Sequence, residues 1–164
     1  MTIYITFWAL LLYLALTIYK VGIPPSLSAS FYLLNEKRKG LGYLFIPTLM
    51  IAGFGLIPTM LDITPESVQF LGFFPGMFLC FVGAAPAFAT IDAKVHYIAA
   101  GLSALLSIVW MAVVMPFSLL VMAGVACMIG ILMLETKTKR AWLFWLEIII
   151  FGSLILTLIY KPCF

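Results

Sequence analysis

The chain has 164 residues, of which 65% are hydrophobic and 9% are charged, and its formal net charge is +3. A typical soluble domain has about half apolar and about a quarter charged residues, so this composition excludes an ordinary water-soluble globular protein. Its few basic residues are typical of membrane topology signals, and we expect no nucleic-acid partner.

Apolar segments recur along the chain, and each is long enough to cross a hydrocarbon core of about 30 Å. They predict an all-α, polytopic transmembrane helix bundle with short loops, forming one integral membrane domain over residues 1–164. The six expected membrane-spanning helices cover residues 3–21, 41–61, 70–91, 95–115, 117–134 and 141–160. The first segment has no basic region before it and no small-residue cleavage site after it, which indicates a retained span.

The fourth and fifth spans are separated only by Met115 and Pro116. One helix over residues 97–134 would be about 57 Å long, which is too long for a single crossing. The sequence therefore predicts a tight hairpin at Pro116. The third span contains Gly83, Ala84 and Ala85, and small residues of this kind allow close packing of helices in lipid, so we expect this span to be central.

Six spans place eight basic residues at one end of the bundle and only Lys161 at the other, whereas merging the fourth and fifth spans gives six against three. The eight are Lys20, Lys37, Arg38, Lys39, Lys94, Lys137, Lys139 and Arg140. Because basic loops stay in the cytoplasm, we expect a multi-pass protein of the cytoplasmic membrane with cytoplasmic basic loops and both termini outside.

The segment after the first span begins with Pro24 and Pro25, which end a helix, and continues through Ser26, Ser28 and Ser30, which suit helix N-termini. It predicts a short interfacial helix or a partly re-entrant turn at the basic end. The alternative interpretation is a flap over a pocket.

Glu147 is the most informative single residue, because an ionisable group at membrane depth is costly and marks a functional site by default. The only histidine, His96, begins a polar stripe at helical spacing that continues through Ser103 and Ser107. The candidate polar cluster comprises Glu147, His96, Asp92, Ser103, Ser107 and Ser28. The alternative is structural: Glu147 locks helices together and His96 binds a loop carbonyl.

Several chemistries remain open. An intramembrane hydrolase or lipid-modifying enzyme would use His96 with Glu147 or Asp92, and Ser28 or Ser26 would supply a nucleophile, although no Gly-x-Ser-x-Gly motif is present. Pairs of prolines in the second and third spans are also typical of a small oligomeric channel or transporter. One histidine and scattered acids do not make a metal site, and we expect neither a metal nor a cofactor.

Two short segments carry a resemblance to a known family. Residues 25–30, PSLSAS, resemble the Pro-Tyr-Ile-Ser-Asp-Thr-Gly segment of the DRAM/Frag-like six-span membrane proteins, and residues 95–100, VHYIAA, are similar to that family's His-x-x-Gly-Ala. The family's tyrosine and aspartate are replaced here by Ser26 and Ala29, and its glycine near the histidine is Ala99. The resemblance implies a non-enzymatic protein of lipid handling or membrane organisation, with this end of the bundle outside.

The leading hypothesis is a membrane protein without enzymatic activity that binds a lipid, an apolar small molecule or a partner in the membrane. Its partners would be membrane lipids and a second copy of the chain or another membrane protein. A catalytic residue is not assigned.

Overall fold

The computed structural model describes residues 1–88, 93–136 and 141–160, and these residues form helices and turns without a strand. The helices are α1 (Thr2–Val21), α2 (Ala29–Lys37), α3 (Phe45–Leu61), α4 (Gln69–Ala84), α5 (Ala93–Val114), α6 (Ser118–Thr136) and α7 (Trp142–Tyr160). Three short 3-10 helices lie beside them, at Leu41–Leu44, Glu66–Val68 and Ala85–Phe88. The predicted all-α bundle is confirmed.

Among the described residues, five helices are long and apolar enough to cross a membrane: α1, α3 with its preceding turn, α4 with its preceding turn, α5 and α7. The apolar part of α6, Ser118–Leu134, is shorter. By length and composition, this is the helix set of a multi-span membrane protein. The predicted hairpin is also present, because α5 ends at Val114 and α6 begins at Ser118.

The third predicted span, residues 70–91, differs from the structure at its end. The α-helix α4 ends at Ala84 and continues only as the 3-10 helix Ala85–Phe88, and residues 89–92 lie outside the described part. Pro86, which has no N–H to donate, lies within this 3-10 segment.

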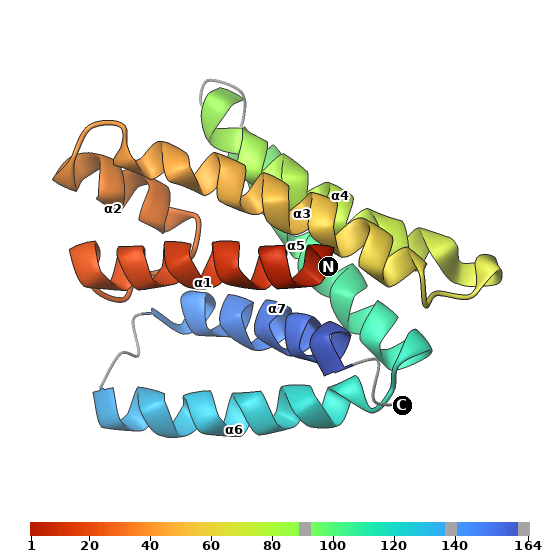
Figure 1. Cartoon of the computed structure of the whole chain (residues 1–164). Coiled ribbons are helices and arrows are strands. Elements are labelled where there is room, and N and C mark those ends of the chain that lie inside the picture. Colours follow the sequence, from red (N-terminus) through yellow and green to blue (C-terminus); the bar gives the residue numbers. More distant parts are fainter. Residues whose placement is uncertain (89–92, 137–140, 161–164) are drawn as a thin grey trace.

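The long helices alternate in direction along the chain (Figure 1). The start of α1 and the end of α7 lie at one end of the bundle, together with the turn between α3 and α4. The opposite end holds α2 and the loops around it. Of the expected basic end, Lys20 lies in the last turn of α1, Lys37 is the last residue of α2 and is followed by Arg38 and Lys39, and Lys94 lies in the first turn of α5. Lys137, Lys139 and Arg140 fall outside the described residues.

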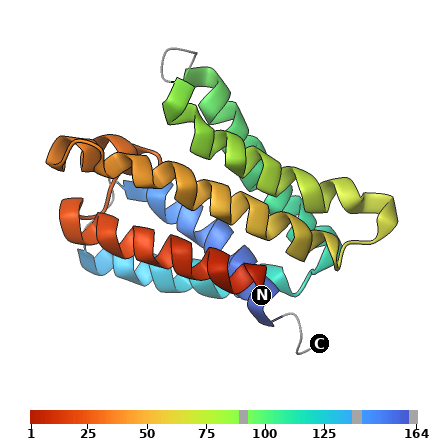
Figure 2. The same cartoon turned by 45° about the horizontal axis from the view of Figure 1, so that its top comes forward.

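The helix α4 packs between α3 and α5, as expected for a central helix (Figure 2). Its contact with α3 is backbone against backbone: a Cβ atom built on Gly53 would lie 2.5 Å from the carbonyl oxygen of Gly76, and one on Gly76 would lie 2.6 Å from that of Gly53. Close approach of this kind gains dispersion energy where lipid gives no hydrophobic driving force.

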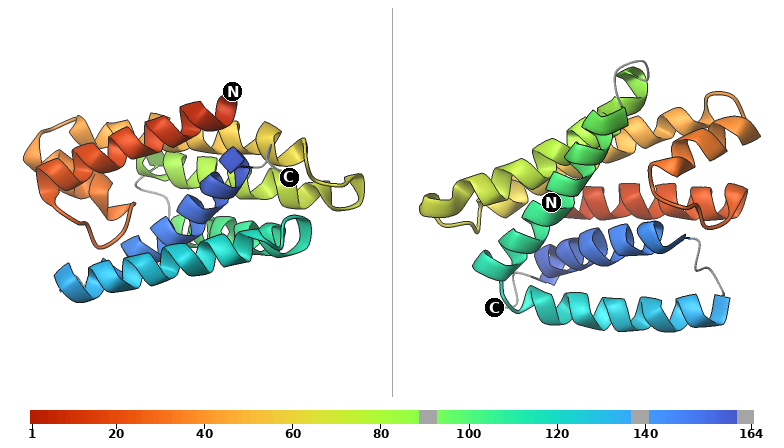
Figure 3. Two further views of the ribbon diagram at one scale, coloured as in Figure 1. Left: turned by 60° about the horizontal axis from the view of Figure 1, so that its bottom comes forward. Right: turned by 180° about the vertical axis from the view of Figure 1, so that it is seen from behind.

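The helix α6 lies at the edge of the bundle, beside α7 and away from α3 and α4 (Figure 3). The helix α7 therefore stands between α6 and α1. This arrangement leaves α1 and α7 in limited contact with each other, and the space between them holds the candidate site.

Candidate functional site

A non-helical segment, residues 22–28, enters the basic end of the bundle between α1 and α2. Backbone at membrane depth needs internal hydrogen-bond partners because lipid supplies none, and α7 provides two. The Phe144 N–H, which belongs to the first turn of α7 and has no partner within that helix, donates to the Pro25 carbonyl at 3.1 Å. The Leu27 N–H donates to Glu147 Oε2 at 2.7 Å.

The same segment reaches α5 and α1 through its serines. Ser28 Oγ shares a hydrogen bond of 2.8 Å with His96 Nε2 of α5. Ser30 Oγ lies 2.5 Å from the buried Tyr13 hydroxyl of α1 and also donates to the Leu27 carbonyl. Side chains of three helices therefore hold residues 25–30, the serine-rich stretch expected as a re-entrant turn, in one place.

Ser103 and Ser107 take no part in this arrangement. Both are fully buried; Ser103 Oγ donates to the Pro75 carbonyl of α4 at 2.8 Å, and Ser107 Oγ donates to the Ser103 carbonyl at 2.7 Å. Ser103 therefore joins α5 to α4, whereas Ser107 bonds within α5, and neither forms a hydrogen bond with Glu147.

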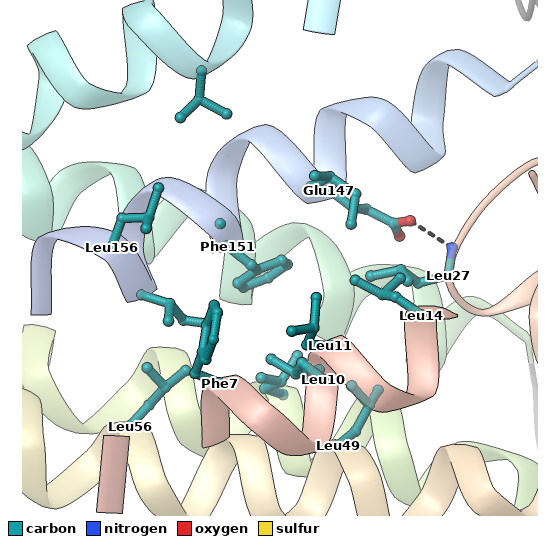
Figure 4. Close-up of a pocket in the computed structure, with 15 residues that line it drawn as sticks. Phe7, Leu10, Leu11, Leu14, Leu27, Leu49, Leu56, Glu147, Phe151 and Leu156 are labelled. Atoms are coloured by element: carbon teal, nitrogen blue, oxygen red, sulfur yellow. Dashed lines mark hydrogen bonds between the residues drawn. The ribbon is translucent and has the colours of Figure 1, made fainter. Parts of the chain in front are cut away.

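An apolar cavity of about 260 Å³ lies between α1 and α7, with contributions from α3, α4 and α6 (Figure 4). Its lining consists of Phe7, Leu10, Leu11, Leu14, Leu27, Leu49, Leu56, Leu79, Val125, Glu147, Ile148, Phe151, Gly152, Ile155 and Leu156. Glu147 is the only polar residue in this lining. It lies beside Leu14 and Leu27 at one end, whereas Phe7, Leu56 and Leu156 lie at the other. The distance from Phe7 to Leu14 along α1 is about 10 Å by helical rise.

Gly152 shows that the cavity wall has open space in front of it. A Cβ atom built on this residue meets no heavy atom within 4 Å, although Gly152 lines the cavity. A Cβ atom at this position would therefore displace no neighbour.

The structure brings some of the predicted site residues together and separates others. Ser28 and His96 are in contact, and the neighbouring Leu27 holds Glu147. Asp92 lies outside the described residues. The hydrogen-bond partner of Glu147 is the Leu27 backbone N–H, and not a side chain of the predicted polar cluster.

The apolar lining of the cavity was not predicted. Leucines spaced along a transmembrane helix look the same whether they face lipid, a neighbouring helix or an internal space. The described residues contain no group of three or more histidine, cysteine, aspartate or glutamate side chains placed to hold a metal ion.

Comparisons with protein-family profiles, curated proteins and solved structures find no match to this chain. The DRAM/Frag-like resemblance therefore stays a prediction, as does the channel or transporter alternative. Function has to be argued from the cavity and from the loop that borders it.

Proposed function

We propose that this membrane protein binds one apolar chain, from a lipid or a small molecule, in the cavity between α1 and α7. The observation that carries the proposal is the cavity itself: about 260 Å³ of space whose walls are apolar almost throughout. Ligand sites in proteins are lined predominantly by hydrophobic and aromatic side chains.

The volume sets the size of the ligand. An engineered apolar cavity of about 150 Å³ holds benzene, so in proportion the present volume takes roughly ten carbon atoms. That is one alkyl chain or part of one acyl chain. The bilayer is a direct source of such a ligand, because α1 and α7 are themselves membrane-spanning by length and composition.

Replacement of Gly152 by leucine is expected to weaken this binding. The new side chain enters open space and occupies part of the cavity, so a ligand that still enters meets an overpacked site. Overpacking costs about 1–3 kcal/mol, which predicts an affinity loss of roughly fivefold to 150-fold. The measurement is saturable binding of radiolabelled decanol to the purified chain in phosphatidylcholine nanodiscs.

Gly101→Leu is the matched control for this experiment. Gly101 is an exposed glycine of α5 with no heavy atom within 4 Å of a built Cβ, and it does not line the cavity. It receives the same side chain in the same kind of helix, and decanol binding should be unchanged. Equal binding by wild type, Gly152→Leu and Gly101→Leu would show that the cavity is not the binding site.

A second candidate function, a serine hydrolase, is favoured by one observation, the 2.8 Å hydrogen bond between Ser28 Oγ and His96 Nε2. This is the nucleophile–base contact that acyl transfer requires. The oxyanion of such a reaction also needs free N–H donors, and those next to Ser28 are already used: Leu27 N–H by Glu147, and Ala29 N–H by Ser26 Oγ at 3.1 Å. This function therefore ranks second.

A fluorophosphonate probe separates the two functions, because it reacts with an activated serine hydroxyl. We expect no labelling of the wild-type chain in nanodiscs, since a serine whose neighbouring donors are occupied lacks transition-state stabilisation. Stoichiometric labelling that disappears in Ser28→Ala and persists in Ser26→Ala would establish the hydrolase instead.

For the orientation in the membrane, we propose that the basic end, which includes α2, faces the cytoplasm, with both termini outside and the cytoplasmic membrane as the location. The excess of lysine and arginine at that end supports this. In a background with Cys80, Cys127 and Cys163 replaced by alanine, an impermeant maleimide should label Ser67→Cys in intact cells and Arg38→Cys only after permeabilisation. The reverse pattern would support the orientation that the DRAM/Frag-like resemblance implies.

A further inference from the structure

Basic side chains gather where two membrane-spanning segments end, Thr2–Val21 and Leu41–Leu61. The end of α1 and the turn after α2 lie at the same end of the bundle (Figure 1). Four basic residues belong to them: Lys20 in the last turn of α1, and Lys37, Arg38 and Lys39 just before Leu41. All four are exposed, and Glu36 is the one acidic residue in the sequence between Lys20 and Leu41. Their charges therefore lie at the level of the lipid head groups.

Hydrogen bonds fix the turn that carries Arg38 and Lys39. The side-chain oxygen of Asn35, Oδ1, accepts the N–H groups of Gly40 and Gly42 at 3.0 Å and 3.1 Å. Gly40 has a φ of +92°, a left-handed conformation that glycine adopts without a steric penalty. The turn is therefore a defined part of the fold, and it holds its basic residues at the end of α2.

Two exposed tyrosines on either side of this turn in the sequence share one support. Tyr32 of α2 is 60% exposed, and Tyr43 of the 3-10 helix before α3 is 56% exposed. Both rings pack edge-on against the buried Phe31, with centroid distances of 5.1 Å and 5.4 Å. Phe31 in turn packs against Phe45 of α3. Exposed tyrosine rings are typical of the head-group region of a membrane, so the tyrosines and the basic side chains indicate the same level.

We propose that this surface binds the head groups of anionic phospholipids in the adjacent leaflet. It consists of Lys20, Tyr32, Lys37, Arg38, Lys39 and Tyr43. Arginine and lysine donate charged hydrogen bonds to phosphate oxygens, and clusters of basic residues beside a membrane-spanning helix attract anionic lipid. The surface is separate from the cavity, and this binding does not depend on the proposed function.

The alternative role of these basic residues is to orient the chain during insertion, with no lipid bound in the folded protein. The two roles differ for the purified protein, whose orientation is no longer at issue. A surface that binds anionic head groups prefers a negatively charged lipid to a zwitterionic one. Residues that act only during insertion give no such preference.

The experiment compares phosphatidylglycerol with phosphatidylcholine of identical acyl chains, each binding to the full chain in detergent micelles, by native mass spectrometry. Because the acyl chains are the same, occupation of the cavity affects both lipids alike, and the ratio of affinities reports the head group. For the wild type we expect phosphatidylglycerol to bind roughly fivefold more tightly or better, the effect of one or more basic contacts. Replacement of Lys37, Arg38 and Lys39 together by glutamine should bring the ratio close to one.

Two variants with matched changes at the same place serve as controls. Lys37→Arg with Lys39→Arg alters the side chains but keeps their charges, so the preference should remain. Glu36→Gln removes a negative charge from the exposed end of α2, so the preference should rise. Equal binding of the two lipids to the wild type would overturn the proposal and leave the basic residues as topology signals. A preference that persists in the triple glutamine variant would also overturn it, because its source would then lie elsewhere on the protein.

Discussion

Gly53→Ala is expected to lower the free energy of unfolding by about 1–3 kcal/mol, the usual cost of overpacking. A Cβ atom at this position would lie 2.4 Å from Cys80 Sγ and 2.5 Å from the Gly76 carbonyl oxygen. The thiol is the end of a side chain and has some freedom to move, but the carbonyl is part of α4, so the two helices must separate. The measurement is unfolding of the purified protein in mixed micelles with increasing dodecyl sulfate.

Two further variants locate the cause of that loss. Gly101→Ala adds the same methyl group to an exposed site of α5 with no heavy atom within 4 Å, and it should not destabilise. Cys80→Ala combined with Gly53→Ala removes the thiol but leaves the Gly76 carbonyl, and it should recover only part of the stability. Complete recovery would mean that the thiol alone is in the way and that the backbones of α3 and α4 are not in contact.

Much of the fold is predictable from the sequence because lipid leaves few choices. A backbone that cannot bond to water forms helices, and the thickness of the bilayer sets their length. These constraints give six helices and place the hairpin at Pro116, since one helix over both spans would be too long. The end of α4 is the exception, because the helix changes to a 3-10 helix at Ala85–Phe88 although the sequence stays apolar there.

The candidate site was only partly predictable. The cost of an ionisable group in a membrane span identifies Glu147, and proline followed by serines identifies the non-helical segment between α1 and α2. Neither signal shows that Glu147 and this segment are in contact. The partner of Glu147 is the N–H of Leu27, and every non-proline residue has such a donor. Contacts of backbone with a distant side chain leave no pattern in residue types.

The cavity was not predictable for a related reason. It exists because α7 lies between α1 and α6 and is not packed closely against α1 along its whole length. The crossing angles of the helices and the side-chain rotamers decide whether a space between helices is filled or left open. They therefore also decide whether Leu10, Leu11 and Phe151 fill the space or border it.

The structure also suggests why the loop and the cavity occur together. Leu27 contributes its side chain to the cavity lining and its N–H to Glu147, while the adjacent Ser28 contacts His96 on α5. Residues 27 and 28 therefore connect the cavity lining with α7 and α5 through one short segment between α1 and α2.

The largest single effect on stability is expected from Trp110→Ala. Trp110 is fully buried at 0% exposure, and its Nε1–H donates to Thr64 Oγ1 at 2.7 Å, while the Thr64 hydroxyl donates to the Met60 carbonyl at 2.6 Å. This chain of hydrogen bonds joins α5 to the end of α3. Removal of the ring leaves a cavity and breaks the chain, so the free energy of unfolding should fall by about 3–5 kcal/mol.

Trp8→Ala is the matched control, because Trp8 is 56% exposed on α1 and the same truncation there removes few packed contacts. Its cost in the dodecyl sulfate titration should be small. Trp110→Phe, Thr64→Val and the double variant then isolate the hydrogen bond, for which we expect a coupling energy of about 1 kcal/mol. Equal losses for Trp8→Ala and Trp110→Ala would contradict the buried position of Trp110. A coupling energy near zero would leave ring packing as the main link between α5 and the end of α3.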